Sequence, residues 1–381
     1  MRDQSTISTS DTRADALIAS YERSGYTRVA PAILQPAEPF LDLAGEDIRR
    51  RLYLTTDAAG REFCLRPDLT IPVVRDYLAS PSAGRAANFC YLGPVFRQWG
   101  ETAGEFVQAG IESFGRTDKA AADAEMLALA LEATAQYGLP QPQIRMGDVA
   151  LFADLIAALG LAPAWKRRLV KHFNHKSNLA HDLERLVLSG TNARPEYQGV
   201  LAALAGSDPK AARALVTDLL SIAGITAVGG RSVGEIADRF LEQSALGAAT
   251  SLPQETRALI ERFLAINGDP DEALAELGAL AADAKLNLEP ALDLLESRTG
   301  FLAASGIEVS RIRFATAFGR GFDYYTGMVF ELHDPSGRAD SQLVAGGRYD
   351  GLPSLLGAPN PIPAVGLAIW IEQLAATGGA Q

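Results

Sequence analysis

The chain has 381 residues, of which 48% are hydrophobic and 21% are charged. These fractions are ordinary for folded globular proteins and exclude a disordered chain, a collagen-like repeat and a coiled-coil rod. The length predicts two or three domains. Asp and Glu outnumber Lys and Arg by 46 to 35, and the net charge of -11 excludes a basic field over the whole chain of the kind that holds nucleic acid.

Cysteine usage and the absence of apolar leader segments indicate the compartment. Cys64 and Cys90 each stand between large apolar or aromatic residues, which is typical of buried, unreactive thiols. We expect no disulfide framework, no metal site and no cofactor. The N-terminus lacks the apolar stretch of a secretion signal, and no segment approaches the roughly 18 apolar residues that span a membrane. These features predict a cytoplasmic protein.

In chain order, the first third predicts a sheet. Apolar spacing over residues 13–23 predicts a helix that ends before Gly25, and a short strand follows over residues 26–30. The sequence TIPVVRDYLA, residues 70–79, predicts a second helix. Segments rich in aromatic and β-branched residues, bounded by turn residues, predict a largely antiparallel set of strands over residues 52–56, 62–66, 88–98 and 105–115.

The middle of the chain predicts helices and the last third predicts further strands. Residues 146–305 are rich in Ala and Leu at helical spacing and carry little strand signal. Strand patterns return over residues 311–318, 327–334 and 341–352, and residues 364–376 predict an apolar helix. Strands of the first third must therefore pair with strands after residue 310. We expect an α+β core over residues 1–145 and 306–381, with a mainly helical insertion over residues 146–305.

Two segments of the first third could carry chemistry. Asp68 stands in LRPDLTIP, where a strand end runs into a helix, and helix capping alone explains the segment. In EFVQAGIE, strand alternation places Gln108, Gly110 and Glu112 on one face. The glycine between two polar residues indicates an open notch for a ligand, because it lowers strand propensity without forming a turn. A sheet with a half-solvated polar face is an equally good explanation.

Two segments near the end are rich in glycine. In GRGFDYYTG, residues 319–327, an arginine between glycines precedes Tyr324 and Tyr325. This combination offers a bidentate cation for a carboxylate beside aromatic walls, which suits an amino-acid pocket. A glycine turn with a surface arginine is the alternative. The sequence AGGRYDGL, residues 345–352, matches neither a dinucleotide fingerprint nor a phosphate loop and predicts a tight strand-to-helix turn.

The histidines predict no metal site. His172 and His175 lie three residues apart in WKRRLVKHFNHK, residues 165–176, but no nearby carboxylate or third ligand completes a metal set. The segment is basic, which favours a solvated helix face; docking to an anionic partner is the alternative.

The order of LRPDLT, CYLGPVFR, EFVQAGIE, RGFDYYTG and GGRYDGL resembles the catalytic core of histidyl-tRNA synthetase, a class II synthetase, across residues 10–145 and 305–375. The resemblance implies an antiparallel sheet flanked by helices, a dimer, and a pocket for histidine. It implies that the ligand ammonium meets Asp68, Thr70 and Gln108, that the imidazole meets Glu112, and that the carboxylate meets Arg320. The aromatic residues around the ring would be Tyr324, Tyr325 and Tyr349.

The departures from the synthetases concern the groups that hold ATP. Arg97, a possible residual anion contact, is followed by the short loop QWGETAGE without Arg or Lys, and Gln373 stands where synthetases carry an arginine against the triphosphate. Activation of an amino acid by ATP needs cations where charge develops on phosphate. Only seven residues follow Leu374, where a synthetase would carry its anticodon-binding domain.

A core that keeps the histidine pocket and lacks the ATP groups resembles the regulatory subunits of ATP phosphoribosyltransferase. This resemblance implies a non-catalytic protein of the first step of histidine biosynthesis. It would activate a short catalytic subunit in a hetero-oligomer and mediate feedback inhibition by histidine, with no tRNA as partner. One alternative is a histidine–tRNA ligase. The other is a synthetase-like module that binds RNA or a different small molecule, for which the basic residues 165–176 are the only support.

Overall fold

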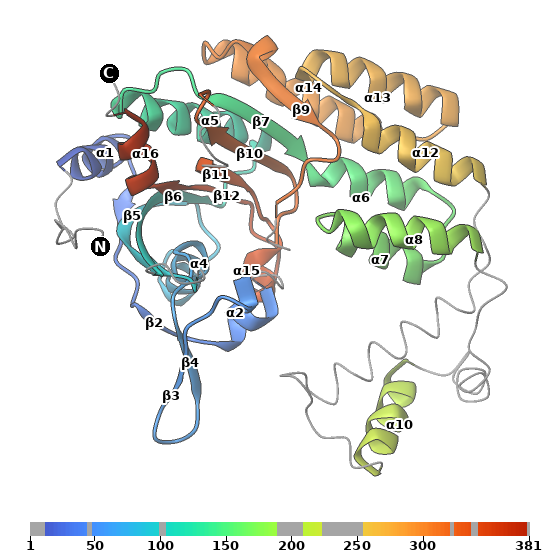
Figure 1. Cartoon of the computed structure of the whole chain (residues 1–381), viewed down its shortest axis with the longest axis horizontal. Coiled ribbons are helices and arrows are strands. Elements are labelled where there is room, and N and C mark those ends of the chain that lie inside the picture. The colour runs from blue at the N-terminus through green and yellow to red at the C-terminus, as the bar shows by residue number, and fades with distance from the viewer. Residues whose placement is uncertain are drawn as a thin grey trace. The chain divides into compact units, whose positions relative to one another are not determined.

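The computed structural model describes residues 12–43, 48–98, 104–188, 209–222, 254–320, 324–336 and 342–378 (Figure 1). The chain divides into two compact units, one formed by Met1–Asp154 with Phe263–Gln381 and the other by Leu155–Arg262. The second unit is narrower than the insertion that we expected over residues 146–305. The difference arises because helices α13 (Pro270–Ala284) and α14 (Glu289–Ala304) pack within the first unit, where α14 contacts α5 (Lys119–Gln136).

A nine-stranded sheet forms the body of the first unit. All neighbouring strands are antiparallel except the pairs β1–β5 and β7–β9. In spatial order the strands are β1 (Thr27–Arg28), β5 (Ala87–Phe96), β6 (Glu105–Phe114), β12 (Ala364–Trp370), β11 (Gln342–Arg348), β10 (Met328–His333), β7 (Gln143–Asp148), β9 (Ile312–Ala315) and β8 (Asn267–Gly268).

Strands from the two ends of the chain meet in the middle of this sheet, as predicted. β6 pairs with β12, so that Glu112 lies opposite Gly366 and Gly110 lies opposite Ala368. The helix predicted over residues 364–376 is wrong in its first part, because residues 364–370 form β12 and only Ile371–Gly378 form helix α16. β12 is buried on both faces and therefore has a continuous apolar sequence, which periodicity cannot distinguish from a buried helix.

Helices cover both faces of the sheet. On one face, α5 packs on β10, β11 and β12, and α1 (Thr12–Arg23) packs on β5 and β6. On the other face, α4 (Thr70–Ala79) contributes Tyr77, whose ring stacks on Phe114 of β6 at 4.3 Å between centroids. α4 has the bounds that the sequence predicts. The fold is the predicted α+β arrangement of an antiparallel sheet between helices.

A small second sheet precedes α4. Its order is β2 (Leu34–Pro36), β4 (Glu62–Leu65) and β3 (Leu54–Thr56), all antiparallel, and helix α2 (Glu38–Leu43) lies between β2 and β3 in sequence. Cys64 and Cys90 are both fully buried, and burial raises the pKa of Cys64 to about 12 and that of Cys90 to about 11. Both thiols are therefore protonated at neutral pH, as their apolar neighbours predict.

The described part of the second unit is helical. It includes the end of α6 (Val149–Ala158), α7 (Pro163–His172), α8 (Lys176–Leu188), α10 (Pro209–Ile222) and most of α12 (Gln254–Ala265). The expectation that no carboxylate lies near His172 is wrong, because Asp182 of α8 is buried against both His172 Nδ1 and Arg168 Nε. Sequence spacing could not reveal this contact because it joins two helices. None of the described helices is long and apolar enough to cross a membrane.

Candidate ligand pocket

Small residues form the floor of a pocket on the α4 face of the large sheet. One row of paired residues runs across five strands: Glu331, Ala345, Ala368, Gly110 and Tyr91. Residues paired in this way present their side chains on the same face. Of the three small central members, Ala345 and Ala368 line the pocket, while Glu331 and Tyr91 stand at the two ends of the row.

The notch predicted at Gly110 is not open. A Cβ atom at this position would lie 2.3 Å from the hydroxyl of Tyr91, which is paired with Gly110 across β5 and β6. The alternative interpretation, a sheet with a half-solvated polar face, is also wrong, because β6 is buried from Gln108 to Phe114. The glycine thus makes room for a tyrosine of the neighbouring strand. Sequence analysis missed Tyr91 as a residue of this region. The signal that could have revealed it is the presence of a large residue opposite a glycine on the neighbouring strand.

The pocket brings together most of the residues that the sequence predicts. Its space has a volume of about 20 Å³, room for about one water molecule. The pocket is therefore closed in this structure. The predicted residues that line it are Asp68, Thr70, Arg97, Gln108, Arg320, Tyr324, Tyr325 and Tyr349. The pocket is also lined by five residues that were not predicted: Ala345, Gly366, Leu367, Ala368 and Trp370.

Asp68 lies at the start of α4 and is 3% exposed. Its Oδ1 accepts a hydrogen bond from the N–H of Ile71 at 3.2 Å, which is the helix-capping contact that the sequence predicts, although Leu69 is the N-cap residue. Its Oδ2 is buried and has no hydrogen-bond partner among the described residues. Burial raises the pKa of Asp68, and the charge of Arg97 opposes this shift. One carboxylate oxygen thus remains available for a cation in the pocket.

Gln108 and Thr70 lie beside Asp68. The side-chain carbonyl of Gln108 accepts a hydrogen bond from the N–H of Leu69 at 3.2 Å and retains a second lone pair. Thr70 is the first residue of α4. Together with Asp68, they place three oxygen-bearing side chains at one end of the pocket, which suits an ammonium group.

Glu112 is fully buried next to the pocket. Its carboxylate accepts hydrogen bonds from the hydroxyl of Tyr91 at 3.1 Å and from the hydroxyl of Tyr349. Burial raises the pKa of Glu112 to about 8, and hydrogen bonds from Tyr349, Thr70 and Tyr91 reduce the shift. Glu112 is not among the residues that line the closed pocket. It contacts the pocket wall through Tyr349.

Arg320 also lines the pocket and is 8% exposed. Its Nη1 donates to the hydroxyl of Tyr325 at 2.9 Å, and its guanidinium stands 5.4 Å from the centre of the same ring. Tyr324 packs against both Tyr325 and Tyr349, with ring centroids 5.0 Å and 5.9 Å apart. The surface-arginine alternative is therefore wrong. Residues 321–323 of this segment lie outside the described residues.

Arg97 is also buried in the pocket wall. Its Nε donates to the carbonyl of Pro67 at 2.8 Å, and its guanidinium stands 5.4 Å from the ring centre of Phe106. Burial lowers its pKa, and the charge of Asp68 opposes the shift. Gln373, in α16, is exposed and does not line the pocket. Residues 99–103 of the loop after Arg97 lie outside the described residues.

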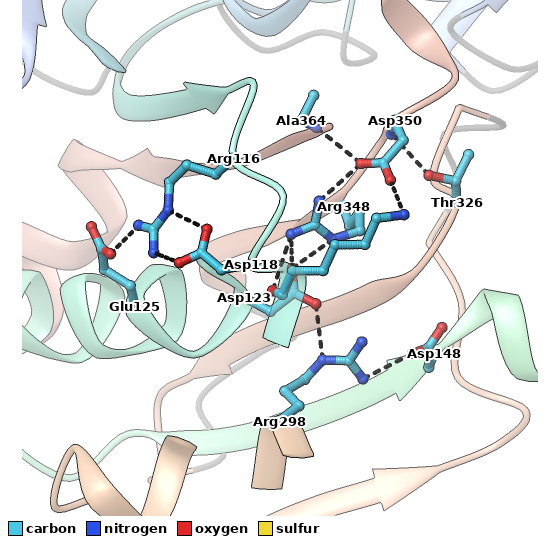
Figure 2. Close-up of polar contacts among 11 residues, drawn as sticks. Arg116, Asp118, Asp123, Glu125, Asp148, Arg298, Thr326, Arg348, Asp350 and Ala364 are labelled. Carbon is cyan, nitrogen blue, oxygen red and sulfur yellow. Dashed lines mark hydrogen bonds and ion pairs between the residues drawn. The ribbon is translucent and has the colours of Figure 1, made fainter. Parts of the chain in front are cut away.

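A buried network of charged residues flanks the pocket, and sequence analysis missed it (Figure 2). Arg348 donates to Asp123 of α5 at 2.8 Å and to Asp350 at 2.9 Å. Asp350 in turn accepts a hydrogen bond from the N–H of Ala364 at 2.9 Å and pairs with Lys119 at 2.8 Å. Arg348 and Asp350 are the sequence neighbours of Tyr349 on either side. The network therefore fixes the backbone that carries this pocket residue.

The predicted strand-to-helix turn is present, since Arg348 ends β11 and α15 (Leu352–Leu355) follows. In the parts of the chain that the structure describes, no group of three or more His, Cys, Asp or Glu side chains is placed to hold a metal ion. The pocket is thus lined by one acid, Asp68, by two cations, Arg97 and Arg320, and by tyrosines.

Known proteins share both the sequence and the fold. The family model for histidyl-tRNA synthetase matches residues 5–231 and 214–374. Proteins from Brucella canis, Brucella suis and Brucella ovis, each named ATP phosphoribosyltransferase regulatory subunit, are 43% identical over 351 residues, which cover 91% of this chain and 92% of each relative. The chain belongs to the family of ATP phosphoribosyltransferase regulatory subunits. This confirms the resemblance found in the sequence.

Solved structures of other proteins share the fold of this regulatory subunit. A crystal structure of an ATP phosphoribosyltransferase regulatory subunit/histidyl-tRNA synthetase from Bacillus halodurans aligns with a TM-score of 0.64 at 21% identity, covering 96% of this chain and 78% of that chain. A histidine–tRNA ligase subunit from Alicyclobacillus acidocaldarius aligns with a TM-score of 0.58 at 24% identity, covering 100% and 96%. The class II synthetase-like fold is confirmed.

Proposed function

We propose that this chain is the regulatory subunit of an ATP phosphoribosyltransferase, that it activates a short catalytic subunit by assembly, and that it binds histidine in the pocket to mediate feedback inhibition. Family membership supports the regulatory role. The protein would work in the cytoplasm, as a homodimer within a hetero-oligomer, without tRNA. Chemistry would reside in the catalytic subunit.

The observation that carries the histidine proposal is the buried Oδ2 of Asp68, which has no hydrogen-bond partner in the described part of the chain. A buried carboxylate oxygen without a partner is costly, and an ammonium group would satisfy it. Arg320, which also lines the pocket, supplies a cation for a carboxylate. An amino acid carries both groups at fixed separation, and the tyrosines with Glu112 offer hydrogen-bonding partners for an imidazole.

The closed pocket supports a regulatory use of histidine binding. A volume of about 20 Å³ is far too small for an amino acid, so the residues around it must move apart to admit the ligand. A ligand that binds one arrangement better than another shifts the balance between them. Histidine would therefore favour an open arrangement of the pocket, and the complex would respond to that change.

The missing ATP groups support a role without amino-acid activation. The loop over residues 98–105 contains no Arg or Lys, and Gln373 has no charge. A synthetase reaction needs cations at the developing phosphate charge. Assays of histidine-dependent exchange between ATP and pyrophosphate separate the proposal from the alternative. We expect no exchange; robust exchange would identify a histidine–tRNA ligase.

The direct test combines this chain with a short catalytic subunit. We expect the mixture to form phosphoribosyl-ATP much faster than the catalytic subunit alone, and we expect histidine to inhibit it. Isothermal titration calorimetry should detect histidine binding to the chain or to the complex. An inactive mixture would contradict the activating role, and the absence of heat from histidine in both samples would contradict the sensing role.

A further inference from the structure

Arg320 has an acidic neighbour outside the pocket. Its Nε stands 3.4 Å from Oε1 of Glu331, while Nη1 donates to Tyr325. The guanidinium is almost completely buried, with 7% of the side chain exposed. A buried cation requires a nearby opposite charge, because burial removes its hydration. Glu331 provides this charge from β10, at the end of the row that forms the pocket floor.

Glu331 is itself held in place by two residues besides Arg320. Gln342 of β11 donates from Nε2 to Oε1 of Glu331 at 2.6 Å, and Nε2 of His333 lies 2.9 Å from Oε2. Burial acts to raise the pKa of Glu331, but the hydrogen bond with His333 and the charge of Arg320 lower it overall. The carboxylate is therefore an anion in a fixed position at neutral pH. A fixed anion can orient a neighbouring arginine side chain.

Glu331 does not line the pocket, whereas Arg320 does. Any effect of Glu331 on a ligand must therefore act through the orientation of Arg320. Nε lies 3.4 Å from Glu331 as an ion pair but makes no hydrogen bond in the described part of the chain, whereas Nη1 donates to Tyr325. The donors that remain for a ligand are therefore those of Nε and Nη2 and the second hydrogen of Nη1. The charge of Glu331 on one side and the hydroxyl of Tyr325 on another set the direction in which the guanidinium presents these donors to a ligand carboxylate.

We propose that Glu331 is a positioning residue, which orients Arg320 and thereby makes the pocket prefer an amino acid with a free carboxylate over the corresponding decarboxylated amine. This inference rests on the proposed function, because it concerns the same pocket. It adds a residue that the family resemblance did not point to. Glu331 would decide specificity without touching the ligand.

The test compares histidine with histamine, which has the same imidazole and ammonium groups but no carboxylate. Calorimetry on the full chain gives the ratio of the two affinities for the wild-type protein and for Glu331→Gln, which keeps the size of the side chain and can still contact Gln342. We expect wild-type protein to prefer histidine, and we expect the substitution to reduce this preference by about tenfold or more, because a charge-assisted contact loses its geometry. Histamine affinity should change little.

The control is Glu276→Gln, which removes one charge from an exposed position of α13. It should leave both affinities unchanged. A ratio that is unchanged or increased in Glu331→Gln would overturn the proposal, since a purely structural defect would weaken both ligands equally and a purely repulsive role would strengthen histidine.

A second measurement needs no ligand. The single variants Glu331→Gln and Arg320→Met and the double variant form a thermodynamic cycle in urea unfolding. We expect the double variant to be less destabilised than the sum of the single variants. Additive effects would show that Glu331 does not hold Arg320 and would overturn the proposal. Wild-type protein that binds neither ligand would instead refute the proposed function and the specificity claim with it, while a non-additive cycle would still establish the pairing.

Discussion

Arg298 of α14 donates from Nε to Asp123 of α5 at 2.9 Å, although 175 residues separate the two in sequence and neither side chain has more than 1% exposure. Arg298 also donates to Asp148, at the end of β7, at 2.9 Å. Asp123 uses its other oxygen for Arg348 (Figure 2). Asp123 is therefore the carboxylate shared by two buried arginines.

We expect Asp123→Asn to destabilise the protein strongly. The substitution leaves two buried guanidinium groups facing a neutral amide, and breaking a buried pair in this way typically costs about 3–5 kcal/mol. The free energy of unfolding, measured from urea denaturation, should fall by this amount. The matched control is Arg257→Gln, which breaks the surface pair with Glu261 and should cost less than about 1 kcal/mol. Similar costs for the two variants would contradict the importance of burial.

Asp68→Asn should weaken histidine binding without weakening the fold. The amide oxygen can still accept the hydrogen bond from Ile71, but it offers no negative charge to the ligand ammonium. We expect at least a tenfold lower affinity by calorimetry, from the loss of one charge-assisted contact of about 1.5–3 kcal/mol. With the catalytic subunit, the variant should still activate but respond poorly to histidine.

The expected effect of Asp68→Asn on the free energy of unfolding follows from the pKa of Asp68. Burial raises the pKa of Asp68 in the folded protein, so ionisation of this group opposes folding at neutral pH. Removing the charge should leave the free energy of unfolding unchanged or higher. Asp76→Asn, on the exposed side of α4, is the control and should leave histidine affinity unchanged. Equal losses of affinity in both variants would argue against the pocket.

Glu112 should make stability depend on pH. Burial raises its pKa from 4.5 to about 8, so between these values the folded chain binds one more proton than the unfolded chain. Stability contributed by this group is therefore present at low pH and is lost as pH rises toward 8. The expected slope is a loss of about 1.4 kcal/mol per pH unit.

The test compares urea unfolding of wild-type protein and Glu112→Gln at pH 5, 6.5 and 8. The variant cannot titrate at this position, so its stability relative to wild type should rise steadily across the series. A constant difference at the three pH values would show that Glu112 ionises with an ordinary pKa.

Gly366→Ala should close the pocket permanently and destabilise the fold. A Cβ atom at this position would lie 1.7 Å from Oε2 of Glu112 and 2.7 Å from the carbonyl oxygen of Ile111. We expect a loss of about 1–3 kcal/mol of stability from overpacking, and no detectable histidine binding. Gly278→Ala is the matched control in α13, where nothing lies within 4 Å, and it should raise stability by about 0.5–1 kcal/mol. Tolerance of Gly366→Ala would contradict the described packing.

Sequence patterns predicted the parts of the fold that have local signals. The helix predicted over residues 70–79, which has a capping residue and an early proline, and the strand predicted over residues 105–115 both match the structure closely. β12 was missed because a strand buried on both faces has no alternation. Its position next to β6 was nevertheless implied by the need to pair strands from both ends of the chain.

Prediction of the pocket depended on the family resemblance for its residue roles, and the structure brings most of those residues together. Two features lay beyond the reach of sequence. That Oδ2 of Asp68 has no hydrogen-bond partner among the described residues can be seen only in the structure, because helix capping is enough to explain the local sequence. The pairing of Asp123 with Arg298 and Arg348 carries no local signal, since each residue stands in an unrelated segment.

The position of β12 also has a consequence for synthesis on the ribosome. Among the described strands β12 comes last in chain order, yet it lies between β6 and β11 in the sheet. Until residue 370 has been made, the nascent polypeptide carries two halves of a sheet whose unpaired edges can join the wrong neighbour. Synthesis of β12 is therefore the event that closes the sheet, and protection by chaperones would be most valuable in the interval before it.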